Sequence, residues 1–269
     1  MSSVAYSVLV RTFNSEATLP ETLEYLRRQT ALPSEYVFID SGSTDGTLRV
    51  VPAESKVHSY VGRVFNYSEA LNQGLVHVSN ELVLILSAHT SLVNPKAIVF
   101  ALELLSRDER VAAAYFDTEA IGGLRATLID RANFDGFNGI WNTCAIIRMS
   151  LLRRRGFRGE VFAAEDQEWT RWLFSCGDMV VARISGAGMD NYSRNKDLQQ
   201  SRTTERKRLN EYVAIAYFVN RNLLGARNLV RVGAQIVRPW SGRFRERRFH
   251  ALLLLRLIAC RFVMPGARV

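Results

Sequence analysis

Polar side chains that could bind a ligand follow three short apolar segments of the sequence. The clearest case is the segment 82–86 (LVLIL), which runs directly into Ser87 and His89. Histidine can bind a divalent metal ion, whereas serine is a poor metal ligand unless a metal-bound phosphate is already present. The end of this segment is therefore either a metal site with an unusual set of ligands or a site that handles charge without a metal.

The other two apolar segments also end in polar residues. Thr12 and Asn14 follow the first segment, and Asp40 and Ser41 follow the second. Near-continuous apolar strands are typical of a parallel sheet that is buried on both faces. Ligands bind beyond the carboxyl ends of the strands in such sheets. We therefore expect the three polar clusters to meet at one edge of a sheet and to form one site.

The elements that would hold these clusters alternate between strands and helices. We expect strands at 6–10, 36–40, 82–86 and 111–116, and helices at 18–29, 70–78 and 95–105. Thr18 and Glu21 have the spacing of a capping box, with Pro20 in the first helical turn. The alternation predicts an α/β fold with a mostly parallel sheet and helices on both faces. The segment 126–147 follows no regular pattern.

The positive charge of the chain is concentrated towards its C-terminus. The chain has 269 residues and a formal net charge of +9, and residues 221–269 contain eleven arginines and one acid, Glu246. We place a boundary between a domain at 1–204 and a basic helical extension at 205–269. Three residues are expected to break this extension into separate helices: Gly233, Pro239 and Gly242.

Such a charge distribution predicts an anionic partner. No nucleic-acid-binding motif accompanies the charge, so we expect no nucleic acid and favour a membrane surface rich in anionic lipid. A solvated pair of basic helices is the alternative. The apolar stretch 251–264 is interrupted by Arg256 and Arg261, so a membrane-spanning helix is not expected.

The cysteine content and the N-terminal residues suggest in which cellular compartment the protein works. Three widely spaced cysteines argue against both a disulfide framework and a structural zinc site. The N-terminus lacks the basic and apolar regions of a signal peptide. We therefore expect a cytoplasmic protein, peripheral on the inner face of the membrane if the basic extension binds lipid.

Several motifs, taken in order, resemble the N-terminal half of family 2 glycosyltransferases. The resemblance covers about residues 4–192, and it is carried by VLVRTFN at 8–14, VFIDSGSTDGT at 37–47, NYSEALNQG at 66–74, LILSAH at 84–89 and the acidic pair at 165–166. It implies a GT-A fold. It also implies an enzyme that transfers a sugar from a nucleotide-sugar donor, with inversion, to a hydroxyl group of an acceptor.

The resemblance assigns roles to the strand-end residues. Asp40 would bind the nucleobase, although an aspartate at this position also commonly caps a turn. The physical reading adds other donor-side residues. Thr12, Asn14 and Ser41 would line the same pocket, Asn72 would pack its helix beneath the nucleotide, and Arg63 and Ser87 would lie at the diphosphate. For Thr12 and Asn14 the alternative is turn chemistry before the helix, and a lone arginine such as Arg63 is usually solvated.

The family carries an Asp-x-Asp motif whose last aspartate binds Mn²⁺ or Mg²⁺, which neutralises the leaving diphosphate. In this chain the aligned residues read Ser-Ala-His, so His89 takes the position of the metal ligand. We expect a Mn²⁺ or Mg²⁺ cofactor bound through His89. Two alternatives remain open: His89 or a nearby arginine stabilises the diphosphate directly, or His89 is hydrogen-bonded to the backbone.

Inversion requires a base that takes the proton of the acceptor hydroxyl group. By resemblance, Asp166 is this base and Glu165 orients it, while Glu168 lies one turn further and could replace it. The alternative is that the three acids only complement the dipole at the start of a helix. Trp169 and Trp172 could stack on a sugar ring, although tryptophans at helical spacing are more often part of a core.

The acceptor side is less defined. The segment 134–141 (FDGFNGIW) lies where the family has a mobile acceptor-side loop, and its two glycines would permit movement. We expect a glycan or lipid-linked acceptor, with the basic extension docked on a membrane or, second, forming a homo-oligomer.

Two other functions are alternatives to sugar transfer. A catalytically inactive nucleotide-sugar-binding protein of the same fold is favoured by the missing carboxylates at 87–89, and the acids at 165–166 argue against it. A nucleotidyltransferase would carry a glycine-rich basic loop after its first strand, which this chain lacks.

Overall fold

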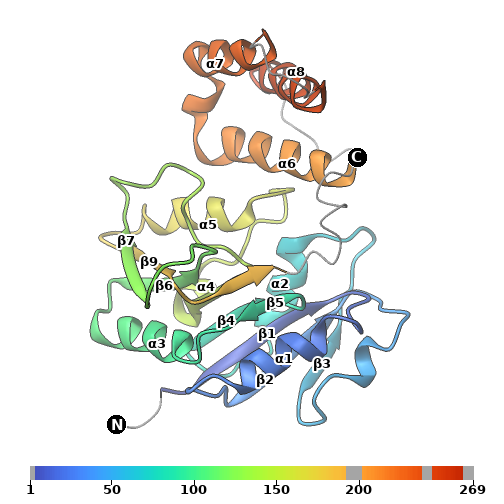
Figure 1. The fold of residues 1–269 in the computed structure, drawn as a ribbon, viewed down its shortest axis with the longest axis vertical. Helices are drawn as coiled ribbons and strands as arrows, with labels where there is room; N and C mark the ends of the chain where they lie inside the picture. Colours follow the sequence, from blue (N-terminus) through green and yellow to red (C-terminus); the bar gives the residue numbers. More distant parts are fainter. Residues whose placement is uncertain (1–3, 192–201, 238–243, 263–269) are drawn as a thin grey trace.

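A computed structural model describes residues 4–191, 202–237 and 244–262 of the chain. Eight strands form the central sheet in the order β3-β2-β1-β4-β8-β6-β9-β7 (Figure 1). In that order they are Lys56–Ser59, Glu35–Asp40, Tyr6–Thr12, Leu82–Ser87, Cys144–Arg148, Val111–Phe116, Val180–Ser185 and Arg125–Ile129. β8 pairs antiparallel with β4 and β6, β7 pairs antiparallel with β9, and the remaining pairs are parallel. The prediction of a mostly parallel α/β sheet is therefore confirmed.

Helices cover both faces of this sheet because the strands are apolar on both faces. On one face of the sheet, the core contains Leu19, Leu23 and Leu26 of α1, side chains of α3, and every second side chain of the strands. On the other face, the core contains side chains of α2, α4 and α5 and the remaining strand side chains, which point to that face. The helices of this part are α1 Leu19–Arg27, α2 Tyr67–Leu75, α3 Ala97–Arg107, α4 Met149–Arg154 and α5 Glu165–Leu173. A short second sheet pairs β5 (Thr90–Leu92) with β10 (Met189–Asn191).

Helix α2 approaches the sheet closely because of one glycine. A Cβ atom on Gly74 would lie 2.5 Å from Cδ1 of Leu9, which is far inside van der Waals contact. The helix begins after Asn66, whose side chain accepts a hydrogen bond from the Glu69 N–H group. At its other end, α2 begins with Tyr67, whose ring lies against the guanidinium group of Arg11 near the end of β1.

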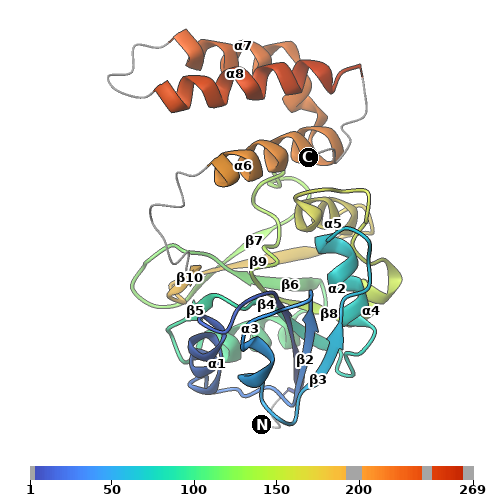
Figure 2. The ribbon, with the colours of Figure 1, turned by 90° about the vertical axis from the view of Figure 1, so that its right-hand side faces the viewer.

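The C-terminal helices form a separate layer beyond α5 (Figures 1 and 2). α6 (Arg202–Ala214) continues into a π-helical turn at Ile215–Val219 and a 3₁₀ turn at Arg221–Leu224, followed by α7 (Ala226–Val237) and α8 (Phe244–Ala259). The predicted boundary between 204 and 205 falls inside the first turn of α6. None of the helices in the described ranges is both long and apolar enough to cross a lipid bilayer.

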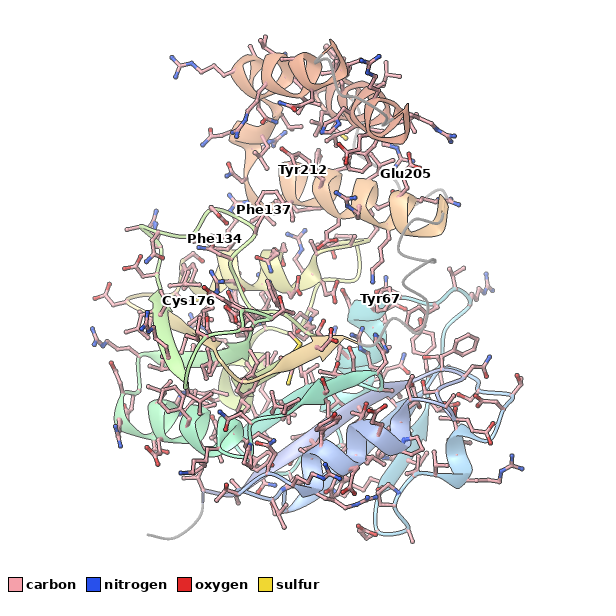
Figure 3. All side chains as sticks on the ribbon, in the orientation of Figure 1. Tyr67, Phe134, Phe137, Cys176, Glu205 and Tyr212 are labelled. Carbon is pink, nitrogen blue, oxygen red and sulfur yellow. The ribbon has the colours of Figure 1, made fainter. Side chains whose placement is uncertain are left out.

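This C-terminal layer is anchored on α5 and on the loop 134–141. Nη1 of Arg171 in α5 donates a hydrogen bond to the Phe218 carbonyl at 2.6 Å. The rings of Phe137 and Tyr212 lie 5.5 Å apart between centroids, and Figure 3 shows them where the loop meets α6. A buried cluster also joins Val161 and Ala164 to Ile215 and neighbouring apolar residues. The C-terminal layer is thus packed on the sheet-bearing part through α6 and the turn 215–219.

Several expectations about local structure were wrong. The segment 126–147 contains most of β7 and β8 rather than only irregular chain. Gly233 does not break the extension, because α7 runs through it, whereas Pro239 and Gly242 lie outside the described residues. Thr18 precedes α1 but makes no side-chain capping bond, so the expected capping box does not form.

Candidate active site

The ends of β1, β2 and β4 open into one cavity of about 500 Å³. In the register of the sheet, Thr12 lies beside Asp40 and Arg11 lies beside Ser87. The cavity is lined by Arg11, Thr12, Phe13, Ser15, Ser41, Phe65, Tyr67, Ser87, Ala88 and His89. The structure therefore brings the predicted residues Thr12, Ser41, Ser87 and His89 together at one edge of the sheet.

Asp40 lies beneath this cavity, and its carboxylate organises the turn after β2. Oδ1 accepts hydrogen bonds from the hydroxyl groups of Thr12 at 2.9 Å and Ser43 at 2.6 Å. Oδ2 accepts hydrogen bonds from the N–H groups of Gly42 at 3.0 Å and Ser43 at 2.8 Å. The residue is only 5% exposed. A nucleobase would have to share an oxygen that the protein already uses.

Asn14 connects the turns after β1 and β2. Its backbone is in the left-handed region at φ 47°, which asparagine tolerates better than most residues. Its Oδ1 accepts a hydrogen bond from the Thr44 N–H group at 2.9 Å, and its own N–H group donates to the Ser43 hydroxyl group at 2.9 Å. Asn14 therefore shapes the rim of the site and does not line the cavity.

Arg63 and Asn72 also lie outside the lining of the cavity. Arg63 is exposed in the segment before α2. The Asn72 amide donates to the Phe157 carbonyl at 2.7 Å and accepts from the Phe157 N–H group at 2.9 Å. These bonds tie α2 to the segment after α4, so the Asn72 side chain is engaged in holding two elements together.

The surroundings of His89 are positively charged. Desolvation lowers the pKa of His89, and the positive charges of Lys207 and Arg11 lower it further. Among the residues that the structure describes, none that lines the cavity carries a carboxylate. Within the described part of the chain, no three His, Cys, Asp or Glu side chains are grouped as metal ligands.

These residues do not fit the expected Mn²⁺ or Mg²⁺ site. Mg²⁺ and Mn²⁺ are held chiefly by carboxylate, carbonyl and water oxygens. The cavity offers one imidazole and a few hydroxyl groups, beside two cationic side chains. The prediction that His89 holds a metal therefore lacks both the donor set and the local charge that a divalent cation requires.

A second cluster lies at the start of α5. Ala164 precedes the helix in the left-handed conformation, at φ 58°. The Asp166 carboxylate accepts hydrogen bonds from the N–H groups of Asn142 at 3.2 Å and Gln167 at 2.8 Å. The neighbouring Glu165 accepts a hydrogen bond from the Asn142 side-chain amide at 3.2 Å. Asn142 thus holds both acids.

Asp166 has the electrostatics of a proton acceptor. Burial, with the neighbouring charge of Glu165 second, raises the pKa of Asp166 from 3.8 to about 8, and Glu211 contributes in the same direction. Desolvation likewise raises the pKa of Glu211. A carboxylate that binds a proton near neutral pH is matched to general base catalysis. Perturbed pKa values of this kind are typical of functional sites.

Helix α6 contributes side chains that the sequence interpretation missed. Lys207 acts on His89 at the strand-end cavity, and Glu211 acts on Asp166 in the second cluster. These two residues are four positions apart and therefore share one face of the helix. The signal in the sequence was the pair of acids, Glu205 and Glu211, within a helix that is otherwise rich in basic residues. Lys207 and Glu211 both lie after the predicted boundary at 204.

Trp169 corrects another expectation. It is fully buried, and its indole N–H group donates to the Arg155 carbonyl at 2.9 Å. It therefore belongs to the core and cannot stack on a sugar. Glu168 pairs with Arg155 and Arg158, so it is engaged away from the role of a replacement base.

Comparisons with known proteins agree with this geometry. Residues 7–156 match the model of the glycosyl transferase family 2, which is more than half of the chain. No curated protein matches the chain.

Solved structures share the fold. The S. aureus TarS 1-349 structure has a TM-score of 0.59 and 20% identity, covering 94% of this chain and 80% of that one. The mannosyltransferase PcManGT from Pyrobaculum calidifontis, in complex with GDP-Man and Mn²⁺, has a TM-score of 0.61 and 18% identity, covering 95% and 85%.

A third neighbour is the glucosyl-3-phosphoglycerate synthase of Mycobacterium tuberculosis with Mn²⁺, UDP-glucose and phosphoglyceric acid. It has a TM-score of 0.57 and 17% identity, covering 79% of this chain and 80% of that one. At such low identity these neighbours show the fold alone, and the family match adds the activity class. The chain therefore belongs to glycosyl transferase family 2, and it is a glycosyltransferase with a GT-A fold.

Proposed function

We propose that this enzyme transfers a sugar, with inversion, from a nucleotide-sugar donor to a hydroxyl group of a glycan or lipid-linked acceptor. The observation that carries the proposal is the half-buried Asp166 carboxylate, which lies beside Glu165, accepts hydrogen bonds from the Asn142 and Gln167 N–H groups, and has a pKa raised to about 8. It lies in the cluster that α6 links to the strand-end cavity through Lys207 and Glu211. The strand-end cavity is suited to the donor, and the cluster at the start of α5 is suited to the acceptor hydroxyl group.

The reaction then proceeds in a single displacement. Asp166 takes the proton of the acceptor hydroxyl group while its oxygen attacks the anomeric carbon of the donor. The bond between that carbon and the diphosphate oxygen breaks, and the nucleoside diphosphate leaves with the electron pair. Because attack comes from the face opposite the leaving group, the anomeric configuration inverts. Desolvation, with the charge of Glu165 second, keeps the pKa of Asp166 high, and Asn142 holds both acids in place.

The donor nucleotide is assigned to the strand-end cavity. Phe13, Phe65 and Tyr67 line it and are 60%, 44% and 45% exposed, so their rings are accessible for stacking with a base. Ser41 and Thr12 supply hydroxyl groups, and Asp40 with Asn14 fixes the turn that carries Ser41. Structural neighbours solved with UDP, UDP-GlcNAc and GDP-Man support a nucleotide-sugar donor.

The acceptor is assigned to the side of the C-terminal helices. A cavity of about 640 Å³ lies between the loop 134–141 and these helices, and Glu211 belongs both to its lining and to the surroundings of Asp166. Exposed apolar side chains on α7 and α8, including Val230 and Leu255, stand among arginines. This combination supports peripheral docking on the inner face of the membrane, with a homo-oligomer as the second assignment.

Asp166→Asn tests the proposal. We expect the release of nucleoside diphosphate from UDP-, dTDP- and GDP-sugars, in the presence of candidate acceptors, to fall about 10²–10⁴-fold. Nucleotide binding measured by calorimetry should be largely kept. The matched control is Asp178→Asn, which removes an exposed carboxylate after α5. Full activity of Asp166→Asn would remove this residue from the mechanism, and nucleotide binding without any transfer by the wild type would favour an inactive binding protein.

A further inference from the structure

We infer that the guanidinium group of Arg11 binds the diphosphate of the donor and replaces the divalent cation expected there. The inference rests on the proposed function, because it takes the strand-end cavity as the donor site. Arg11 is the penultimate residue of β1, and its register partner on β4 is Ser87. Both residues line the cavity together with His89.

The first observation is that Arg11 has unused hydrogen-bond donors. Its Nε and Nη1 atoms are buried, and neither has a hydrogen-bond partner among the residues that the structure describes. The guanidinium Cζ lies 5.0 Å from the centroid of the Tyr67 ring, which supports the planar group from one side. A buried donor without a partner is costly to the folded protein, and a charged one more so. Such a group persists where a ligand supplies the missing acceptor.

The second observation is the sign of the charge around the cavity. Within residues 4–191, 202–237 and 244–262 its lining contains no carboxylate, and the positive charges of Arg11 and Lys207 both act on His89. A divalent cation placed there would be repelled by these side chains. A diphosphate carries negative charge on several oxygens, and the planar fork of an arginine matches phosphate oxygens in pairs. The cavity therefore has the chemistry of an anion site.

The third observation is the composition of the lining. Phe13 and Phe65 supply aromatic surface, whereas Arg11, Ser87 and His89 supply donors of hydrogen bonds. A nucleoside diphosphate combines the matching groups, an aromatic base and an anionic diphosphate. When the bond to the anomeric carbon breaks, negative charge develops on the leaving diphosphate oxygen. Arg11 stabilises this charge in the way that a bound cation otherwise would.

The experiment compares wild type, Arg11→Gln and Arg11→Lys by calorimetric titration, with Mn²⁺ and with EDTA. The probes are UDP, dTDP, GDP, the matching nucleosides and inorganic pyrophosphate. We expect one nucleoside diphosphate to bind wild type equally under both conditions. Arg11→Gln should weaken its binding about 10–100-fold, as expected for charged hydrogen bonds, without changing the binding of the nucleoside. Arg11→Lys should retain part of the affinity.

Two controls separate this role from a structural one. Arg107→Gln removes an exposed arginine on α3 and should leave all binding unchanged. Because the buried donors of Arg11 have no partner, Arg11→Gln should raise the melting temperature of the ligand-free protein. A lower melting temperature together with unchanged diphosphate binding would make Arg11 a structural residue and overturn the inference.

The remaining outcomes distinguish the inference from the proposed function. If binding requires Mn²⁺ and Arg11→Gln binds as wild type does, the inference fails and the donor site stands. If no nucleoside diphosphate binds but pyrophosphate binds in an Arg11-dependent way, the anion site stands and the proposed function fails. If neither probe binds wild type, both are overturned.

Discussion

The charge of Glu165 should set the pH range in which the enzyme works. Glu165→Gln removes that charge and keeps the oxygen that accepts the hydrogen bond from the Asn142 side chain. Because the pKa of Asp166 is raised to about 8 by burial first and by Glu165 second, the substitution should lower this pKa without restoring an ordinary value. We expect the pKa of Asp166 to decrease by about one unit, which is the size of interaction typical of adjacent titrating groups and corresponds to about 1.4 kcal/mol.

The effect on the rate has two parts. Asp166 acts as a base only when it is deprotonated, so kcat/KM should rise with pH through about 8 in wild type. At pH 6 a decrease of one unit makes the deprotonated form about nine times more abundant. The base also becomes weaker, and if half of that free energy is felt in the transition state, the limiting rate falls about threefold. Glu165→Gln should therefore be about threefold faster than wild type at pH 6 and about threefold slower at pH 9.

The assay is kcat/KM for the release of nucleoside diphosphate between pH 5.5 and 9.5, because this parameter reports groups of the free enzyme. Glu160→Gln, which removes an exposed carboxylate paired with Arg158, is the control and should leave the profile in place. A profile that does not move, or that moves to higher pH in Glu165→Gln, would refute the assignment of Asp166 as a base governed by its neighbour.

Two further predictions concern packing and docking. Gly74→Ala should lower the free energy of unfolding by about 1–3 kcal/mol, because the added Cβ atom would overlap Leu9. Urea denaturation measures this change. An unchanged urea midpoint would contradict the close approach of α2 to the sheet. The chain should sediment with vesicles rich in phosphatidylserine and not with neutral vesicles. The double variant Arg227→Gln, Arg248→Gln should bind them about 30-fold more weakly, at roughly 1 kcal/mol per arginine. Equal sedimentation of wild type and the double variant would argue against docking through α7 and α8.

The sequence was sufficient to predict the first half of the fold because its strands are buried on both faces. Each of the first strands is an apolar run that ends in polar residues, and the order of these runs predicts the parallel sheet. β7 was missed because it is an edge strand whose residues are mostly exposed and do not alternate. β8 was missed because its five residues follow an irregular loop, and its burial comes from pairing with distant strands.

The site was predictable only where it follows from strand ends. Thr12, Ser41, Ser87 and His89 converge because parallel strands end at the same edge. The role of Arg11 was not predicted, because the sequence does not show that two of its buried hydrogen-bond donors have no partner among the described residues. Trp169 was assigned to the sugar because helical spacing alone does not tell which face of α5 enters the core. Lys207 and Glu211 depend on the packing of α6, which no local pattern reveals.

The anchoring of α6 has a consequence for engineering this enzyme. A fragment that ends at 204 would expose Val161 and Ala164 to water, because their apolar partners lie after that point. It would also remove Glu211, whose charge acts on Asp166. Exchanging the C-terminal helices for those of a relative would therefore change both the solubility of the protein and its acid–base behaviour. A chimera intended to alter acceptor choice should keep α6 and its following turn through Asn220, and should join the foreign sequence at or beyond the start of α7.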